Sequence, residues 1–412
     1  MITVVGRDGG PLPPRALAAL AAASCVVGAP RHLDSVPVPG GARRVELRNL
    51  GRALDEVAAA TGDVVVLASG DPGLFGVVRA LRERGLRPRV IPAVSSVALA
   101  FAAAGLPWDD ALVLSAHGRA AGPVLAAALA HPKVAVLTAP GSGPERFAPD
   151  LLAAGREVVV AERLGAPDER VVRLSPRAGR SPALSAGEFA QPNVLIAYDP
   201  ARAAGERAGW LAGHQGAPDG WALGEDAFEH RDSMITKAEV RAVVLARLGP
   251  RPGTVVWDVG AGSGSVAVEC ARFGARVIAF ERDAGQCARI RANAVRHGVH
   301  VEVVPGPAPA ALDGAPAPDA VFLGGGGEEV AAAAVRHGPR RVVAALASLD
   351  RVAPLRALLA GAGYAVEGTQ LQASRLAGLP NGSVRLVAAN PVFVVWGERA
   401  PEGGAPSAEE NG

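Results

Sequence analysis

The chain has 412 residues, of which 49% are hydrophobic and 20% are charged, and its net charge is +2. This composition supplies enough apolar material for folded cores and excludes a largely disordered chain. The near balance of charge gives no basic field that would favour a nucleic-acid partner. At about 100–200 residues per domain, the length predicts two or three domains.

Cysteine content and apolar runs indicate the compartment. Cys25, Cys270 and Cys287 are too few and too scattered for a disulfide framework or a zinc site, which favours a reducing compartment. Every stretch of about 18 residues is interrupted by a charged residue, proline or glycine, so no membrane span is expected. The N-terminus lacks the basic region and apolar core of a signal peptide. We expect a cytoplasmic protein without a metal ion.

The first half of the chain alternates short apolar strands with alanine-rich helices, a pattern typical of α/β architecture. Strands are expected at residues 2–5, 25–27, 64–68, 90–92, 112–115, 134–137, 157–162 and 194–198. Helices are expected at residues 15–23, at 74–84 and in a segment that ends at residue 104. A loop rich in glycine and proline, residues 6–14, follows the first strand.

The second half begins after residues 201–232, where the periodicity fades and a linker is predicted. A helix at residues 237–248 follows, with Thr236 as its N-cap and Glu239 as the capping-box partner. A strand, a glycine-rich turn and a helix are predicted from residue 255 to residue 273. Later strands are expected at residues 277–280, 301–304, 320–323 and 341–345.

The C-terminal region is predicted to end in a pair of antiparallel strands, residues 384–387 and 392–396. The dipeptide Asn390-Pro391 supplies a turn between them. Residues 399–412 are rich in glycine, proline and glutamate, and we expect them to be disordered.

The most informative motif is D-x-G-x-G-x-G, which begins at Asp258 and joins a buried strand to a helix. Its glycines permit a tight turn and a close approach of backbone to ligand, and the helix start offers free N–H groups. Glu281 ends the next strand and can accept both ribose hydroxyls of an adenosine. Because Asp258 would repel a pyrophosphate and suit an ammonium or sulfonium, the motif favours S-adenosylmethionine over a dinucleotide.

Several segments around this motif carry a family resemblance. They are residues 234–241, 306–309, 322–327 and 390–397. Together with the glycine loop they resemble the decarboxylating domain of the precorrin-6Y methyltransferases of cobalamin biosynthesis, over about residues 220–398. The resemblance implies that S-adenosylmethionine contacts Thr236, Gly260, Ala261, Gly262, Ser263, Gly264, Glu281 and Ala308. Pro307 and Ala345 depart from the family, which usually has Asp and Asn there.

The first half carries a second set of motifs at strand ends. They are residues 27–33, 69–76, 91–96 and 115–119. The set resembles the tetrapyrrole methylase fold, specifically the domain that methylates C5 in the same pathway, over about residues 1–200. It implies donor contacts from Gly70, Asp71, Pro72, Ser95 and Ser96. His117 is either a substrate-orienting residue of this site or a structural histidine. The loop at residues 6–14 is more compressed than in the family.

The two resemblances in tandem imply a fused C5,15-methyltransferase. We expect a tetrapyrrole methylase domain of two α/β subdomains at residues 1–200 and a Rossmann-like class I methyltransferase domain at residues 233–398. The implied reaction methylates precorrin-6Y at C5 and C15 and removes CO₂ from the ring C acetate, giving precorrin-8X. One donor site per domain and a homo-oligomer are also implied. The alternatives are an N-terminal domain that serves only as a scaffold, and a class I RNA methyltransferase.

The implied chemistry asks little of protein nucleophiles. The donor is already electrophilic, and the bridging carbons of a reduced tetrapyrrole are enamine-like, so alignment in a dry site is the main requirement. No catalytic residue is therefore predicted. Arginines near the second site are expected to orient substrate carboxylates. The candidates are Arg231, Arg241, Arg375 and Arg385.

Overall fold

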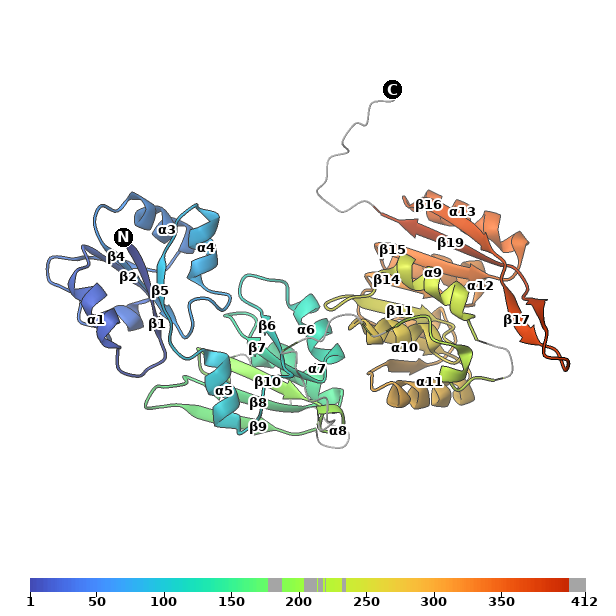
Figure 1. The fold of residues 1–412 in the computed structure, drawn as a ribbon, viewed down its shortest axis with the longest axis horizontal. Coiled ribbons are helices and arrows are strands. Elements are labelled where there is room, and N and C mark those ends of the chain that lie inside the picture. Colours follow the sequence, from blue (N-terminus) through green and yellow to red (C-terminus); the bar gives the residue numbers. More distant parts are fainter. Residues whose placement is uncertain (177–186, 204–212, 214–217, 219, 232–234, 400–412) are drawn as a thin grey trace, which may run out of the picture. The chain divides into compact units, whose positions relative to one another are not determined.

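The computed structural model describes residues 1–176, 187–203, 213, 218, 220–231 and 235–399 (Figure 1). These residues fall into two compact units, one within residues 1–121 and 132–214 and the other within residues 122–131 and 215–412. No helix among the described residues is long and apolar enough to cross a membrane.

The first unit begins with a parallel five-stranded sheet in the order β3-β2-β4-β1-β5. Its strands are β1 (Ile2–Arg7), β2 (Cys25–Gly28), β3 (Arg43–Glu46), β4 (Val64–Ser69) and β5 (Arg89–Ile91). Its helices are α1 (Pro14–Ala21), α2 (Pro30–Leu33), α3 (Leu50–Ala59) and α4 (Val77–Glu83). Separate apolar clusters lie on the two faces, one with α1 and α2 and one with α3 and α4. This arrangement explains the continuous apolar runs, because strands covered on both faces do not alternate.

The strand order creates a topological switch point in this sheet. The chain leaves β1 toward β2 on one side and leaves β4 toward β5 on the other, while β1 and β4 are neighbours. Arg7, the last residue of β1, is paired in register with Ser69, the last residue of β4. Ligands of open α/β sheets bind at such points, outside the carboxyl ends of the strands.

A second, mixed sheet completes the first unit, in the order β6-β7-β10-β8-β9. Its strands are β6 (Leu112–Ser115), β7 (Lys133–Leu137), β8 (Glu157–Glu162), β9 (Arg170–Leu174) and β10 (Asn193–Tyr198). The helices of this unit are α5 (Ser96–Ala104), α7 (Pro144–Ala153) and α8 (Pro200–Ala203), whereas α6 (Ala121–Ala130), between β6 and β7 in the chain, belongs to the second unit except for its first residue. Phe101 of α5 is fully buried in a cluster with Val159 and Ile196, which fixes α5 on the sheet.

The second unit is a doubly wound domain around a seven-stranded sheet, in the order β13-β12-β11-β14-β15-β19-β16. Its strands are β11 (Val255–Val259), β12 (Arg276–Glu281), β13 (Glu302–Pro305), β14 (Ala320–Leu323), β15 (Arg341–Leu346), β16 (Ala365–Leu371) and β19 (Val392–Glu398). Its α-helices are α9 (Ala238–Leu248), α10 (Ser265–Arg272), α11 (Ala284–Arg296), α12 (Gly327–Arg336) and α13 (Val352–Gly361). Short 3₁₀ turns are η1 (Glu225–Ala227), η2 (Ala310–Leu312) and η3 (Leu349–Arg351). The α/β fold with a Rossmann-like second domain agrees with the sequence prediction.

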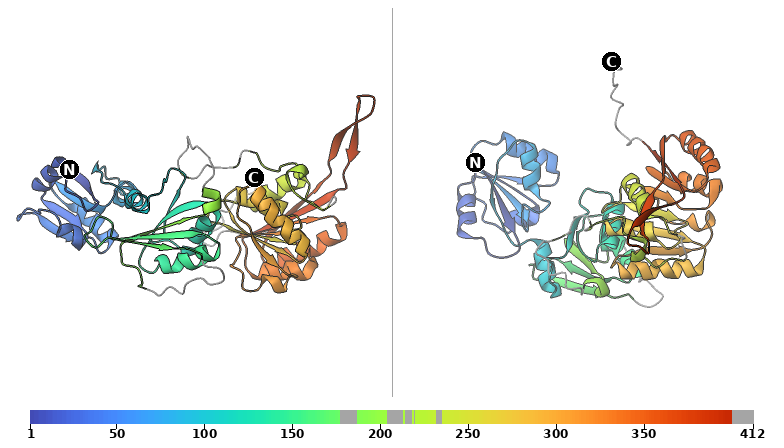
Figure 2. Two further views of the ribbon diagram at one scale, coloured as in Figure 1. Left: turned by 90° about the horizontal axis from the view of Figure 1, so that it is seen from below. Right: turned by 45° about the vertical axis from the view of Figure 1, so that its right-hand side comes forward.

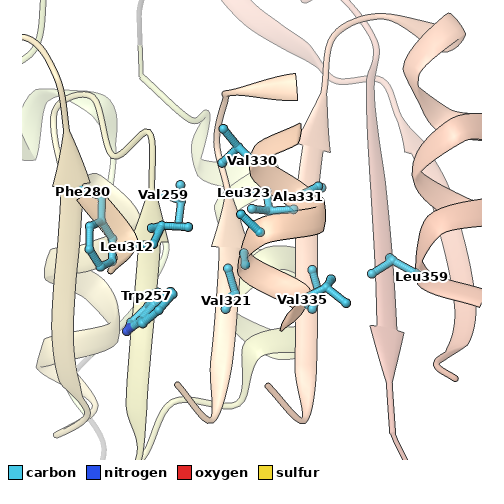
Figure 3. Close-up of a cluster of buried hydrophobic side chains, with 14 of the residues drawn as sticks. Trp257, Val259, Phe280, Leu312, Val321, Leu323, Val330, Ala331, Val335 and Leu359 are labelled. Atoms are coloured by element: carbon cyan, nitrogen blue, oxygen red, sulfur yellow. The ribbon is translucent and has the colours of Figure 1, made fainter. Parts of the chain in front are cut away.

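Helices cover both faces of this sheet. One buried cluster joins the sheet to α12 and α13, and a second joins it to α9, α10 and α11. Figure 3 shows Trp257 of β11 beside Phe280 and Val321 of the neighbouring strands in the first cluster. Trp257 is fully buried, and its indole N–H donates to the Pro316 carbonyl at 3.1 Å. Trp257 is thus a core residue of the second unit.

The predicted terminal strand pair is wrong. Strand β18 (Val384–Ala388) pairs with β17 (Ser374–Gly378), which the sequence did not reveal, and β19 instead lies between β15 and β16. The apolar residues of β19 can be buried on both faces there, whereas β17 and β18 are largely exposed. Figure 2 shows β17 and β18 as a ribbon that extends away from the seven-stranded sheet.

The predicted capping box at Thr236 is also wrong. The N-cap of α9 is Lys237, and it makes no side-chain capping bond. The free amide of Ala238 instead donates to Glu225 Oε1 at 3.1 Å. A carboxylate from the preceding segment has replaced the local cap, which sequence spacing does not reveal. Within the predicted linker, η1 and the buried Phe228 are part of the second unit's fold.

Candidate functional site

A cavity of about 980 Å³ opens at the carboxyl ends of β11, β12 and β14 in the second unit. This sheet has its switch point between β11 and β14, and residues from both of these strands line the cavity. Those predicted from the sequence are Arg231, Thr236, Gly260, Ala261, Gly262, Ser263, Glu281 and Ala308. Further lining residues that the sequence analysis did not assign include Phe280, Asp283, Gln286, Phe322 and Val392. Pro307 and Ala345, the two departures from the family pattern, line it as well.

The glycine loop has the backbone that its sequence demands. Gly260, Gly262 and Gly264 all have positive φ, at 74°, 56° and 75°. A Cβ on Gly264 would stand 2.9 Å from two carbons of Ile290, while a Cβ on Gly262 would meet nothing within 4 Å. Gly264 therefore serves helix packing and does not line the cavity, whereas Gly262 leaves its space open to a ligand.

Glu281 holds the loop from the neighbouring strand. Its Oε2 accepts the Gly262 amide at 2.8 Å, and its Oε1 accepts the Asp283 amide at 2.9 Å. The carboxylate thus stands at the mouth of the glycine turn, where it can exchange amide donors for the hydroxyls of a ribose.

Asp258 lies outside the cavity, although its charge had suggested that it would face the ligand. Its side chain is 1% exposed, and Oδ2 accepts the Ala267 amide of α10 at 2.9 Å. Oδ1 has no hydrogen-bond partner among the described residues. Burial raises the pKa of this carboxyl to about 7. Asp258 therefore holds the start of α10 from behind the glycine loop, because its carboxylate accepts a helix amide there and does not face the ligand space.

The cavity fits S-adenosylmethionine. Its volume lies within the roughly 300–1,000 Å³ typical of ligand sites. Phe280 and Phe322 give it apolar walls, and Glu281 supplies a hydroxyl acceptor. Asp283 adds a second carboxylate, which suits a ligand with an ammonium and a sulfonium. The glycines at 260 and 262 leave room for the ligand against the backbone.

Arg241, a predicted substrate residue, does not reach the cavity. It is fully buried and donates to Glu269 Oε1 at 3.1 Å. Its other nitrogens donate to the carbonyls of Thr236, at 2.5 Å, and Leu223. Glu269 is also fully buried, and it accepts the Leu223 amide at 2.8 Å. The pair ties the segment before α9 to α10 and so positions Thr236 at the cavity.

The other three candidate arginines differ in their contacts and in whether they line the cavity. Arg375 on β17 is paired with Glu225 and, at 2.7 Å, with Glu239, so it is already neutralised by two carboxylates. Hydrogen bonding to Arg375 holds the pKa of Glu225 at about 2. Arg385 lies on the exposed strand β18 and does not line the cavity. Of the four candidates, only Arg231 lines it.

In the first unit the structure brings the predicted donor loops together. The Gly70 amide donates to the Arg7 carbonyl at 2.6 Å, and a Cβ on Gly70 would stand 3.0 Å from the Ser96 amide. Asp71 Oδ1 accepts the Gly73 amide at 2.8 Å, and Pro72 is buried. Ser95 caps α5 by accepting the Ala98 amide at 3.1 Å. The shape of these loops thus depends on their own hydrogen bonds.

His117 is exposed on the loop after β6, and its Nδ1 lies 3.3 Å from the Thr138 carbonyl. Its neighbour Arg119 lies over the ring of Phe75, with its guanidinium carbon 5.6 Å from the ring centroid. Phe75 belongs to the loop that follows Asp71, so the two predicted segments meet.

One cluster of polar side chains was not predicted by the sequence analysis. Arg31 and His32, on α2, both approach Ser69 Oγ, at 2.9 and 2.8 Å. Burial, and then the charges of Arg31 and Arg7, lower the pKa of His32 to about 4. The segment 27–33 had been noted only as a family motif. The order of the strands, which no local pattern reveals, places it beside Arg7 and Ser69.

Alanine at Gly262 and at Gly264 should separate ligand binding from stability. Both changes carry the left-handed penalty of about 1–2 kcal/mol, and Gly264→Ala adds overpacking of about 1–3 kcal/mol against Ile290. We expect Gly264→Ala to lower the free energy of unfolding more, and Gly262→Ala to weaken binding of S-adenosylhomocysteine more. Denaturant unfolding and calorimetric titration measure the two effects. The reverse ranking would contradict this assignment.

Glu269→Gln should leave the buried Arg241 charge uncompensated. Loss of one partner of a buried pair costs about 3–5 kcal/mol, so the second unit should become less stable by that amount. Affinity for S-adenosylhomocysteine should fall too, because Arg241 holds Thr236. The control is Arg340→Gln, which removes an exposed pair with Glu398 and should cost about 1 kcal/mol or less. Equal losses in chemical denaturation would refute the positioning role.

Comparison with known proteins agrees with the two units. A family model described as a precorrin methyltransferase domain matches residues 226–394. Another, described as tetrapyrrole (corrin/porphyrin) methylases, matches residues 5–177. A cobalt-precorrin-7 C(5)-methyltransferase of Salmonella typhimurium is 37% identical over 183 residues, 42% of this chain and 89% of the relative. A probable cobalt-precorrin-6B C(15)-methyltransferase (decarboxylating) of Pyrobaculum calidifontis is 35% identical over 197 residues, 45% of this chain and 97% of the relative.

A longer match joins both regions in one relative. A precorrin-6Y C(5,15)-methyltransferase (decarboxylating) of Sinorhizobium sp is 38% identical over 339 residues. The match covers 79% of this chain and 78% of the relative. The chain therefore belongs to the family of the decarboxylating precorrin-6Y C(5,15)-methyltransferases.

Proposed function

We propose that this chain methylates precorrin-6Y at C5 and C15 with S-adenosylmethionine and removes CO₂ from the ring C acetate, giving precorrin-8X in cobalamin biosynthesis. The cavity at the ends of β11, β12 and β14 carries the proposal, because the glycine loop and Glu281 line it together. The relative named for both methylations and the decarboxylation supports it.

The residues of the second site would bind and orient. When bound, S-adenosylmethionine supplies a methyl group on a positively charged sulfur, which a nucleophilic ring carbon can attack directly. Glu281 would hold the ribose hydroxyls, and the backbone at Gly260 and Gly262 would lie against the donor. Phe280 and Phe322 would exclude water from the reacting atoms. Arg231, at the cavity, would orient a carboxylate of the substrate.

We assign the two methylations to separate domains. Residues 1–200 would carry the C5 site, with donor contacts at Gly70, Asp71, Pro72, Ser95 and Ser96. Residues 233–398 would carry the C15 site and the decarboxylation. Each domain would bind one donor. A cytoplasmic location fits the free and buried state of Cys25, Cys270 and Cys287.

We also propose that the chain is a homo-oligomer that uses the β17–β18 ribbon. Leu376 and Leu386 are paired in register and, with Val384, share one face of the ribbon. They are 72%, 66% and 61% exposed. An isolated two-stranded ribbon with an exposed apolar face is marginally stable, and such patches mark interaction sites. Arg375 lies on the opposite face and pairs with Glu225 and Glu239, so the apolar face is left for a second copy.

Incubation of the full chain with S-adenosylmethionine and precorrin-6Y tests the reaction. Mass spectrometry should show a gain of two methyl groups and the loss of one CO₂, and calorimetry with S-adenosylhomocysteine should show two sites per chain. Gly262→Val, which fills the second site, should leave one site and abolish C15 methylation. One methyl with CO₂ loss in the unmodified chain would instead favour an N-terminal scaffold. No change with the metal-free or the cobalt-containing substrate would refute the proposal.

Light scattering after size exclusion tests the oligomer. The unmodified chain should exceed the mass of one protomer, 41.6 kDa. The double variant Leu376→Glu, Leu386→Glu should be monomeric, because two carboxylates would have to be buried in the interface. Val295→Glu, at a residue that is 81% exposed on α11, is the matched control and should leave the mass unchanged. A monomeric unmodified chain would contradict this proposal.

A further inference from the structure

Two arginines meet at the switch point of the first sheet without acidic partners. Arg7 ends β1, and Arg31 lies just after β2, on α2. Neither forms an ion pair among the described residues, whereas Arg44, Arg84, Arg170 and Arg241 each pair with a carboxylate. Arg31 donates instead to a neutral hydroxyl, Ser69 Oγ, at 2.9 Å. Arg7 donates to the Gly10 carbonyl at 3.0 Å and to Ser35 Oγ at 3.5 Å.

The acidic side chains nearby are already occupied. Asp8 accepts the amides of Gly10 and Val94, at 3.0 and 3.2 Å. Asp71 accepts the Gly73 amide. Asp34, on the turn after α2, pairs with Arg44 at 2.7 Å. Arg7 and Arg31 therefore have no carboxylate in direct contact among the described residues, at the end of the sheet where ligands bind.

Arg7 and His32 show that this charge is concentrated. Arg7 is half-buried, and its Nε is shielded from solvent without a hydrogen-bond partner among the described residues. An unsatisfied buried donor of this kind is costly unless a ligand supplies the acceptor. After burial, the charges of both arginines lower the pKa of His32, whose Nε2 lies 2.8 Å from Ser69 Oγ, and so help to keep its imidazole neutral.

Arg31, His32 and Ser69 thus form one hydrogen-bonded group at the ends of β2 and β4, and Arg7, at the end of β1, is near enough to His32 for its charge to act on the imidazole. Guanidinium forks match the planar, two-oxygen geometry of a carboxylate. We propose that Arg7 and Arg31 form a carboxylate-binding subsite of the first unit, with Ser69 and His32 holding Arg31 in place. The proposal rests on the proposed function for its ligands, since the tetrapyrrole side chains and the methionine end of the donor both carry carboxylates.

Arg7→Met and Arg31→Met in the full chain test the subsite. Loss of a charged hydrogen bond should weaken binding by about 10-fold to 100-fold. If the carboxylate belongs to the tetrapyrrole, the KM for the tetrapyrrole in C5 methylation rises by that factor with little change in kcat. The affinity of the first unit for S-adenosylhomocysteine then stays constant. If the carboxylate belongs to the donor, the affinity of the first unit for S-adenosylhomocysteine falls instead. Arg31→Lys, which keeps the charge but loses the fork, should recover part of either loss.

Arg87→Met is the matched control. Arg87 is exposed and precedes β5, so it lies at the amino ends of the strands, away from the proposed subsite. Its loss should change neither the KM for the tetrapyrrole nor the affinity for S-adenosylhomocysteine. C15 methylation by the second unit is the internal control for folding and should be retained in every variant. If both methionine variants match Arg87→Met in KM and in inhibitor affinity while C5 methylation proceeds, the subsite is refuted. Absence of any methylation in the unmodified chain would instead refute the proposed function.

Discussion

The close approach of neighbouring parallel strand ends is the constraint on which both units depend. In the second unit a Cβ on Gly324 would stand 2.8 Å from the Gly260 carbonyl oxygen, across the ends of β14 and β11. In the first unit a Cβ on Gly6 would overlap the Gly70 carbonyl oxygen and stand 2.6 Å from the Ala93 amide, across the ends of β1, β4 and β5. Both places are switch points, where connections leave in opposite directions. Glycine permits the crowding, and the divergence of the chain leaves space for a ligand.

The sequence predicts those parts of this arrangement that are contiguous in the chain. The turn from Asp258 to Gly264 is one unbroken segment, so its spacing alone shows strand, turn and helix. The acid at Glu281 follows one helix later and could be found by the same pattern. Gly70 and Gly260 could be identified from the sequence for this reason, and the structure places both at strand ends with positive φ.

Pairings between distant segments could not be predicted from local sequence patterns. Arg241 and Glu269 are buried together because α9 packs beside α10, and no spacing rule joins them. Thr236 looked like a helix cap, but Glu225 arrives from an earlier turn and takes the helix amide. The terminal strands were misassigned for a similar reason, since β19 gains more burial between β15 and β16 than beside β18. In each case a tertiary partner displaced the local one.

The charged side chains at the two switch points differ. At the second switch point, Glu281 and Asp283 line the cavity together with Arg231, Lys237 and Arg282, and Asp258 lies behind it. Cations occupy the first, where Arg7 and Arg31 have no carboxylate partner among the described residues. On the assignments proposed here, the second edge attracts the positively charged donor, while the first attracts a carboxylate. On the same assignments, the glycine loops leave room for a ligand in both units, and the charged residue that ends one strand, Glu281 in the second unit and Arg7 in the first, would help to select that ligand.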